Sequence, residues 1–178
     1  MILLGKPLDT RKTFEHVQVH FDYDDLLTET TDAGRVYFTE DSKKYPSITT
    51  VLSILSRDGI AAWRRKVGDE VADRISKQAA DRGSAVHQII EDYIDNKEDY
   101  DAGLFPHILD TFQSVKPIID ERIGKIYAQE QPLYSLHLGV AGRVDCVAEF
   151  DGKLSIIDFK TSKKRKTRSR VYNYFMQE

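Results

Sequence analysis

Two aspartates toward the C-terminal end of the chain have the spacing of a metal-binding pair. They lie in the segments 140–150 and 153–162, which are joined by Asp151-Gly152. Asp-Gly between two alternating apolar runs predicts a two-residue hairpin turn, because both turn residues must tolerate a positive φ. In the register that this turn sets, Asp145 lies directly opposite Asp158. Two opposed carboxylates repel each other, and a divalent cation between them would remove the repulsion.

Side-chain alternation along the same hairpin predicts one polar face and one core face. Residues two apart on a strand share a face, so Lys160 points the same way as Asp158, and Arg143 the same way as Asp145. Arg143 is a candidate phosphate contact, because its guanidinium offers a fixed fork of donors. A solvated face of alternating charge is the alternative, and the opposed aspartates argue against it. The other face carries the expected core side chains: Val144, Cys146, Ala148, Ile157 and Phe159.

Three motifs follow one another along the chain. They are Arg82-Gly83-Ser84-Ala85-Val86-His87, Gly142-Arg143-Val144-Asp145 and Ile156-Ile157-Asp158-Phe159-Lys160-Thr161-Ser162. Together they resemble the PD-(D/E)xK nuclease superfamily, in particular its RecB-like exonuclease branch, over roughly residues 80 to 178. In that branch a helix supplies a histidine, one strand supplies an aspartate, and the next strand supplies a D/E-x-K triplet.

The resemblance implies a role for each of these residues. His87, Asp145 and Asp158 would hold Mg²⁺ or Mn²⁺, and Lys160 would be the catalytic lysine. A bound cation would lower the pKa of a water molecule, which Lys160 would orient, or whose developing charge it would stabilise. The branch often has a glutamine on the helix after the third strand, and Gln177 falls at that place.

The expected histidine helix carries further candidates. Glu91 lies one turn after His87 on the same face, and a metal-bound imidazole usually donates its other N–H to a carboxylate. We therefore expect Glu91 to orient His87, with an ordinary surface pair as the alternative. Gly83, one turn before His87, would permit the close approach of a neighbouring segment. Glu130, on the strand before Asp145, is interpreted as a strand-face residue and only secondarily as a site residue.

A basic cluster follows the D-x-K triplet, although the net charge of the chain is −3. Lysine and arginine side chains bind phosphates and release counterions, so this position favours contact with a nucleic-acid backbone. A solvated loop and a nuclear-localisation-like run are the alternatives. The basic cluster consists of Lys163, Lys164, Arg165, Lys166, Arg168 and Arg170.

The composition restricts the kinds of site that the chain can hold. Cys146 is the only cysteine, which excludes an intrachain disulfide, a Cys-based zinc site and a Cys₄ iron–sulfur cluster. No apolar run approaches the length of a membrane span, and the N-terminus lacks the basic-then-apolar pattern of a signal peptide. We expect a cytoplasmic protein in an intracellular, reducing setting, with no membrane partner.

The whole chain, residues 1–178, is expected to form one nuclease domain of the α/β class. Residues 1–68 would add an N-terminal β-hairpin and helices, with a strand at 35–38. Residues 69–178 would form a restriction-endonuclease-like core of a helix, a three-stranded mixed sheet and a helix. The superfamily core has one more strand at its end, so we expect the C-terminal end of the core to be incomplete. A missing segment or a partner protein would then complete it.

Hydrophobic periodicity and turn residues predict where the elements of this core lie. A helical stretch before the sheet contains Pro117, where we expect a kink or a break. The expected elements are helices at 69–96, 108–123 and 170–178 and strands at 125–134, 140–150 and 153–161.

These expectations describe a metal-dependent DNA exonuclease that hydrolyses phosphodiester bonds. It would act on single-stranded DNA or DNA ends in replication, recombination or repair. A structure-specific or restriction-type endonuclease is the alternative with the same chemistry. A nucleic-acid-binding module of the same fold without turnover is a further alternative, and the intact Asp145, Asp158 and Lys160 argue against it.

Overall fold

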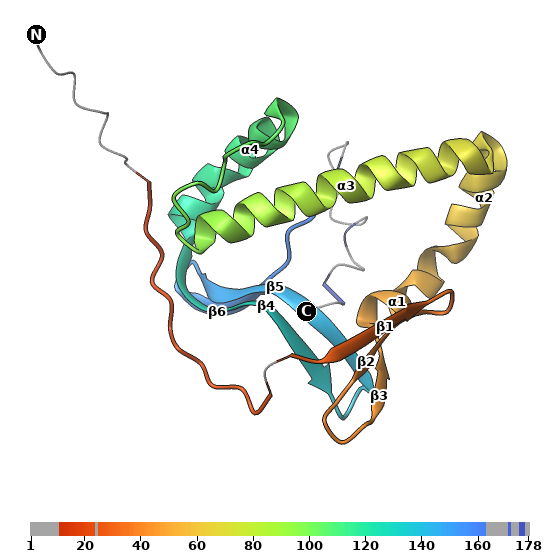
Figure 1. Cartoon of the computed structure of the whole chain (residues 1–178), viewed down its shortest axis with the longest axis horizontal. Coiled ribbons are helices and arrows are strands. Elements are labelled where there is room, and N and C mark those ends of the chain that lie inside the picture. Colours follow the sequence, from red (N-terminus) through yellow and green to blue (C-terminus); the bar gives the residue numbers. More distant parts are fainter. Residues whose placement is uncertain (1–10, 24, 163–170, 172–174, 177–178) are drawn as a thin grey trace, which may run out of the picture.

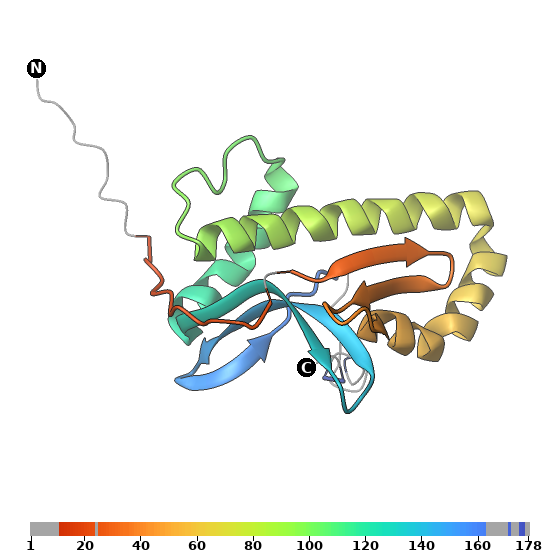
Figure 2. The ribbon, with the colours of Figure 1, turned by 60° about the horizontal axis from the view of Figure 1, so that its bottom comes forward.

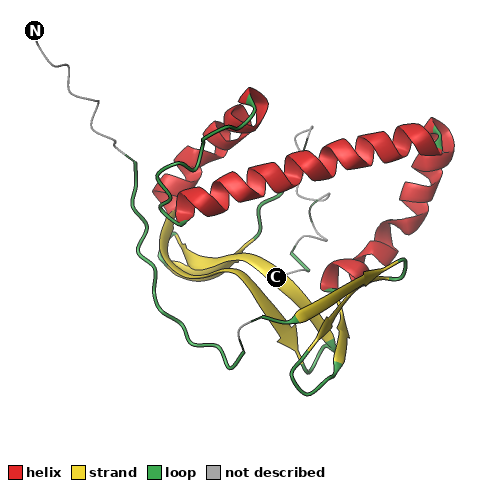
Figure 3. Cartoon of the chain, in the orientation of Figure 1, coloured by secondary structure: helices red, strands yellow, loops and turns green. Residues whose placement is uncertain are grey.

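The computed structural model describes residues 11–23, 25–162, 171 and 175–176. Within these residues, a three-stranded sheet is followed by four α-helices and then by a second three-stranded sheet (Figures 1 and 3). The expected α/β class is confirmed. None of the helices in this part of the chain has both the length and the apolar character needed to cross a membrane.

The first sheet is an antiparallel meander of β1 (Leu27–Thr31), β2 (Gly34–Phe38) and β3 (Lys44–Pro46). The predicted strand at 35–38 therefore exists, and β1 and β2 form the N-terminal hairpin. Gly34 has a φ of 117°, and a Cβ there would lie 2.2 Å from a side-chain carbon of Thr50. Glycine is required because the hairpin packs directly against the helix that follows it.

Three helical segments lead from the first sheet to the long helix. They are α1 (Ile48–Ser53), a 3₁₀ turn (Ile54–Ser56) and α2 (Arg57–Val67). Gly68 has a φ of 83° and separates α2 from α3 (Asp69–Ile94). A residue with a side chain rarely adopts this backbone conformation, so glycine permits the sharp change of direction between the two helices.

The long helix α3 passes over the second sheet and continues beyond it to α2 (Figure 1). Apart from Ala72, its buried residues all lie in its C-terminal part, namely Val86, Ile89, Ile90, Tyr93 and Ile94. His87 therefore lies where the helix first meets the core. The next helix, α4 (Pro106–Arg122), is continuous through Pro117, so the predicted break does not occur. Burial of Phe112 and Ile119 on either side of the proline offsets the loss of one helical hydrogen bond.

The second sheet has the order β4 (Ile123–Ser135), β5 (Val140–Phe150) and β6 (Lys153–Ile157). Asp151 and Gly152 both have positive φ, at 51° and 74°, which confirms the predicted two-residue turn. The predicted register is also confirmed, with Phe150 paired with Lys153 and Cys146 with Ile157. Cys146 and Ala148 are fully buried against α3 and α4, as the core face requires.

The third strand is shorter than predicted, because β6 ends at Ile157 and not at Thr161. Asp158 consequently does not pair with Asp145 in the ladder, and the prediction of directly opposed aspartates is wrong. The reason is local. The backbone N–H of Phe159 donates to Oδ2 of Asp145 at 2.7 Å, so a side chain replaces the ladder partner.

The two sheets meet through a group of tyrosines. The ring of Tyr134 on β4 lies 5.6 Å from that of Tyr45 on β3 and 5.5 Å from that of Tyr23. Ser47 also forms a bridge with Ala141 on β5, so the first sheet stands beside the far end of the β4–β5 hairpin (Figure 2). The ladders of the described strands are antiparallel throughout, and the parallel component of the expected mixed sheet is limited to isolated bridges in those residues.

Candidate metal centre

Asp145 lies in the middle of β5 and is held from two sides. Its Oδ2 accepts the N–H of Phe159 and lies 3.4 Å from Nδ1 of His87 on α3. The ring of Phe159 packs edge-on against that of His87, with centroids 6.4 Å apart. After Ile157 the chain leaves the sheet, and Phe159 then contacts both Asp145 on β5 and His87 on α3. These contacts connect the strand to the helix at the candidate site. The side chain of Asp145 is only 16% exposed.

Asp158 and Lys160 form an ion pair beside Asp145. Nζ of Lys160 lies 2.5 Å from Oδ1 of Asp158, and the carboxylate is the more buried of the two groups. Both residues are close enough to change the pKa of Asp145. The structure therefore brings the four residues predicted for metal binding and catalysis to one place, although Asp158 lies outside the tightest cluster of donor atoms.

That tightest cluster contains a residue that sequence reasoning placed on a strand face. One donor atom each from His87, Glu130 and Asp145 lie within 4.8 Å of one another. Glu130 belongs to β4 and has a φ of 46°. The register of β4 and β5 depends on the loop that joins them, and this loop contains no Asp-Gly turn signal. The sequence therefore left Glu130 as a secondary candidate for the site, after its interpretation as a strand-face residue.

The two carboxyl groups of this cluster, Glu130 and Asp145, both have a raised pKa, so their ionised forms are disfavoured at this position. Burial raises the pKa of Asp145, and Asp158 raises it further, whereas the Phe159 N–H, His87 and Lys160 lower it. The pKa of Glu130 is also raised, first by burial and then by Asp145. Burial removes the hydration that stabilises a negative charge. A nearby cation would supply the missing stabilisation.

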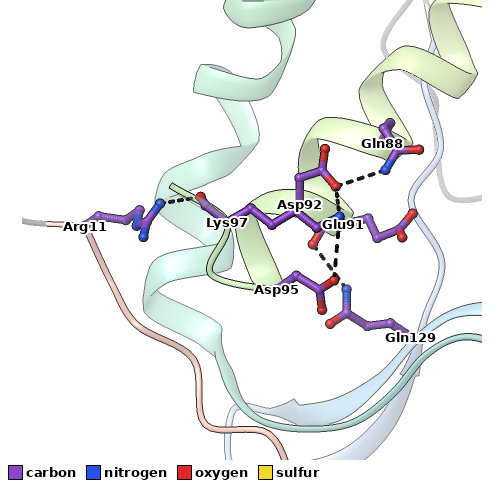
Figure 4. Close-up of polar contacts among 7 residues, drawn as sticks. All are labelled: Arg11, Gln88, Glu91, Asp92, Asp95, Lys97 and Gln129. Carbon is purple, nitrogen blue, oxygen red and sulfur yellow. Dashed lines mark hydrogen bonds and ion pairs between the residues drawn. The ribbon is translucent and has the colours of Figure 1, made fainter. Parts of the chain in front are cut away.

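Among the described residues, no hydrogen bond or ion pair joins the side chains of Glu91 and His87. The backbone carbonyl of Glu91 accepts a hydrogen bond from Nε2 of Gln129 at 3.3 Å (Figure 4), and burial raises the pKa of its carboxyl. Asp92, the residue after Glu91, forms an ion pair with Lys97, whose Nζ lies 2.5 Å from its carboxylate (Figure 4). The imidazole of His87 faces Asp145 instead, so the expected role of Glu91 in orienting His87 stays a prediction.

Arg143 is already engaged by two partners. Its guanidinium donates to the backbone carbonyl of Glu130 and to Oδ1 of Asp25, the latter at 2.6 Å. A phosphate would have to share or displace these acceptors. Gly83 has room for a side chain, because a Cβ there would lie 3.7 Å from Oγ1 of Thr161, an ordinary contact. Gly83 therefore permits the approach of Thr161, as expected, but a residue with a Cβ would permit it as well.

A cavity of about 370 Å³ opens beside the carboxylates. Its lining includes Asp145, Asp158 and Lys160, and extends to Arg35 on β2 and Tyr134 on β4. This volume falls within the range of about 300–1,000 Å³ that ligand pockets occupy. The cavity therefore connects the polar centre with the place where the two sheets meet.

The basic cluster, which is predicted to bind phosphates, lies outside the described residues, as does Gln177. It consists of Lys163, Lys164, Arg165, Lys166, Arg168 and Arg170. The structure therefore neither supports nor opposes the expected roles of these residues.

The donor chemistry of the centre fits a divalent cation. Carboxylate oxygens are the preferred protein ligands of Mg²⁺ and Mn²⁺, and a neutral imidazole adds one nitrogen. Cys146 lies next to Asp145 in the chain but is fully buried in the core, so it offers no thiolate. The set of His87, Asp145 and Asp158 therefore suits a hard or borderline divalent metal.

The chain belongs to the PD-(D/E)XK nuclease superfamily, which it matches over residues 58–177. This stretch is more than half of the chain and contains the whole centre. The chain is also similar to the mouse (Mus musculus) protein named mitochondrial genome maintenance exonuclease 1. The two are 33% identical over 85 residues, which is 48% of this chain and 25% of that protein. The chain thus covers about a quarter of that relative. The superfamily uses divalent metals, and both matches support nuclease activity.

Proposed function

We propose that the protein hydrolyses phosphodiester bonds in DNA with Mg²⁺ or Mn²⁺, as an exonuclease on single strands or free ends in replication, recombination or repair. One observation carries the proposal: Asp145 and the Asp158–Lys160 pair line one cavity, and His87 lies 3.4 Å from Asp145. The superfamily supports the chemistry. The name of the mouse relative favours the exonuclease mode over an endonuclease.

Each of these residues has a task that its surroundings suit. His87, Asp145 and Asp158 would hold the cation, which when bound supplies a water of lowered pKa and neutralises charge on the phosphate. The ammonium of Lys160 donates a hydrogen bond to Asp158, which would fix a positive charge beside the scissile phosphate. Such a preorganised charge stabilises the transition state more than the substrate. The N–H of Phe159 fixes the orientation of Asp145.

Thermal unfolding with and without metal tests the centre directly. Mg²⁺ or Mn²⁺ should raise the melting temperature of the wild type, because a ligand that binds only the folded state stabilises it. Asp145→Asn and Asp158→Asn should abolish cleavage and together remove this shift. Asp145→Asn also removes a largely buried charge that Asp158 makes harder to ionise, so its metal-free form should melt at or above the wild-type temperature. Asp158→Asn instead loses the ion pair with Lys160. Equal shifts in the wild type and the double variant would overturn the metal assignment.

The mode of attack is tested with end-labelled linear and closed circular single-stranded DNA, each with Mg²⁺, Mn²⁺ or EDTA. An exonuclease must bind a free end, so linear strands should be degraded and circles spared. EDTA should stop both reactions. Circles that are cut as fast as linear strands would favour the endonuclease alternative.

A further inference from the structure

We infer that Glu130 is an additional ligand of the cation, and that Arg143 is a positioning residue that holds the backbone of Glu130 in place. Together with His87, Asp145 and Asp158, Glu130 would give the cation one nitrogen and three carboxylate groups, from α3, β4, β5 and the segment after β6. This inference rests on the proposed metal-dependent function and adds a fourth residue to the three ligands named there.

The backbone of Glu130 is the first observation. Among the described residues other than glycine that have a positive φ, Glu130 is the one that lies inside a strand. Asn96 and Asp151 occupy turns and belong to residue types that tolerate this conformation. Glutamate has no such tolerance. Strained backbone inside a regular element persists where the surroundings hold it, and it is concentrated at functional sites.

Contacts of Arg143 support the backbone of Glu130. The ladder between β4 and β5 pairs Gln129 with Cys146 and Gln131 with Val144, but does not pair Glu130 with Asp145 between them. The guanidinium of Arg143 binds the carbonyl of Glu130 from across the ladder. Asp25 in turn holds the other side of that guanidinium. The side chain of Arg143 therefore supports the backbone of Glu130 at the point where the ladder does not.

Charge is the second observation. One oxygen each of the Glu130 and Asp145 carboxylates lies within 4.8 Å of the same imidazole, and Asp145 raises the pKa of Glu130. The nearest lysine and arginine are committed elsewhere, because Lys160 pairs with Asp158 and Arg143 pairs with Asp25. Two carboxylates that face one histidine leave a negative charge for a cation to neutralise.

Titration of the intact chain with Mn²⁺ and Mg²⁺ by calorimetry, without nucleic acid, tests the inference without relying on activity. Glu130→Gln should weaken Mn²⁺ affinity by about tenfold or more, since even residues that only orient a ligand change metal affinity by about 10–100-fold. Glu130→Asp keeps a carboxylate and suits the backbone, so it should retain part of the affinity. Glu149→Gln is the matched control. Glu149 is a half-buried carboxylate on the same sheet that contacts Tyr127, and the control should bind Mn²⁺ like the wild type.

A second variant separates ligation from backbone support. Asparagine accepts a positive φ more readily than glutamate but has no carboxylate, so Glu130→Asn should fold well and still bind Mn²⁺ weakly. Arg143→Ala should weaken affinity less than Glu130→Gln, because it leaves the ligand itself in place. Wild-type affinity in Glu130→Asn or Glu130→Gln would overturn the inference. If Asp145→Asn abolished binding in the same experiment, the proposed function would stand. A wild type that bound neither metal would overturn both.

Discussion

Lys160 makes an ion pair with Asp158, and both groups lie at the cavity. In the proposed reaction the lysine acts on the phosphate and the water, whereas the aspartate also holds the metal. The two residues are neighbours on one short segment. Their contributions can nevertheless be separated, because one serves the transition state and the other serves binding.

Lys160→Ala should reduce turnover by about 10²–10³-fold, the usual cost of removing one preorganised donor. Its metal affinity and most of its affinity for DNA should remain, since the ligands of the cation are untouched. Single-turnover cleavage at saturating DNA measures the first quantity, and calorimetry measures the second. Cleavage at a near wild-type rate would show that Lys160 is an ordinary surface lysine.

Sequence reasoning at the residue scale named His87, Asp145, Asp158 and Lys160 as site residues, and it gave Glu130 only as a secondary candidate. The first four belong to motifs whose residue types and order follow the chemistry. The placement of Glu130 depends on how β4 pairs with β5, which the residues of the connecting loop do not specify. A left-handed glutamate inside a strand has no local signature, because it is imposed by contacts with residues far along the chain, Arg143 among them.

At the scale of elements, the hairpin turn was predictable in full. Asp-Gly fixes the turn type, and the turn type fixes the register. The end of β6 was not predictable, since it depends on a hydrogen bond from Phe159 to the side chain of Asp145. Alternation of apolar residues continues past the point where the chain leaves the sheet. The pattern therefore overestimated the length of the strand.

The turn itself gives a prediction that depends on pH. Arg122 donates to the carboxylate of Asp151 and lowers its pKa below the ordinary value of 3.8. A carboxyl whose pKa is lowered on folding stabilises the protein above that ordinary value, and this contribution disappears as the pH falls through the lower folded value. Asp151→Asn keeps the tolerance for positive φ and removes the charge. Its melting temperature should therefore be lower than that of the wild type at neutral pH, and the difference should shrink as the pH falls below 3.8.

Asp151→Ala removes both the charge and the tolerance for positive φ. It should melt below Asp151→Asn across the whole range, which thermal unfolding between pH 2 and pH 7 would show. If the two variants coincided at every pH, the turn geometry would contribute nothing to stability.

The helix α3 provides a second prediction at this scale. Gly83 lies inside α3, and a Cβ there would make only an ordinary 3.7 Å contact with Oγ1 of Thr161, so Gly83→Ala should stabilise the protein by about 0.5–1 kcal/mol. For a chain of this length that corresponds to a rise of roughly 1–4 °C in melting temperature. Metal affinity should not change. A loss of stability would mean that the helix and the segment at Thr161 approach more closely than the structure shows.

At the scale of the whole molecule, two sheets from opposite ends of the chain enclose the cavity. The first sheet contributes Arg35 and Tyr37, the second contributes Asp145, and the segment after β6 contributes Asp158. The tyrosine contacts at Tyr134 hold the two sheets together. A DNA strand that reached the metal centre through this cavity would touch both sheets. We therefore propose that residues 1–68 take part in binding the substrate.

The basic cluster after the D-x-K triplet should contribute to affinity rather than to chemistry. Replacing Lys163, Lys164, Arg165 and Lys166 together by alanine should weaken binding of all DNA sequences alike. The slope of log K against log salt should become shallower by about 0.7 for each phosphate of a single strand that the variant no longer binds. Cleavage at saturating DNA should persist. An unchanged slope would identify the cluster as a solvated loop.

The single cysteine of the chain lies beside the metal centre with its thiol turned into the core. Burial raises the pKa of Cys146 to about 12, and its side chain is 0% exposed. An alkylating reagent reacts with an exposed thiolate, so labelling requires β5 to separate transiently from the helices above it. The rate of labelling, followed by mass spectrometry, should be far lower than in the denatured chain. Mn²⁺ should slow it further, because a bound cation joins the elements that have to part. An unprotected thiol would contradict the packing of β5. The protein thus contains a chemical reporter of local opening within one residue of its proposed active centre.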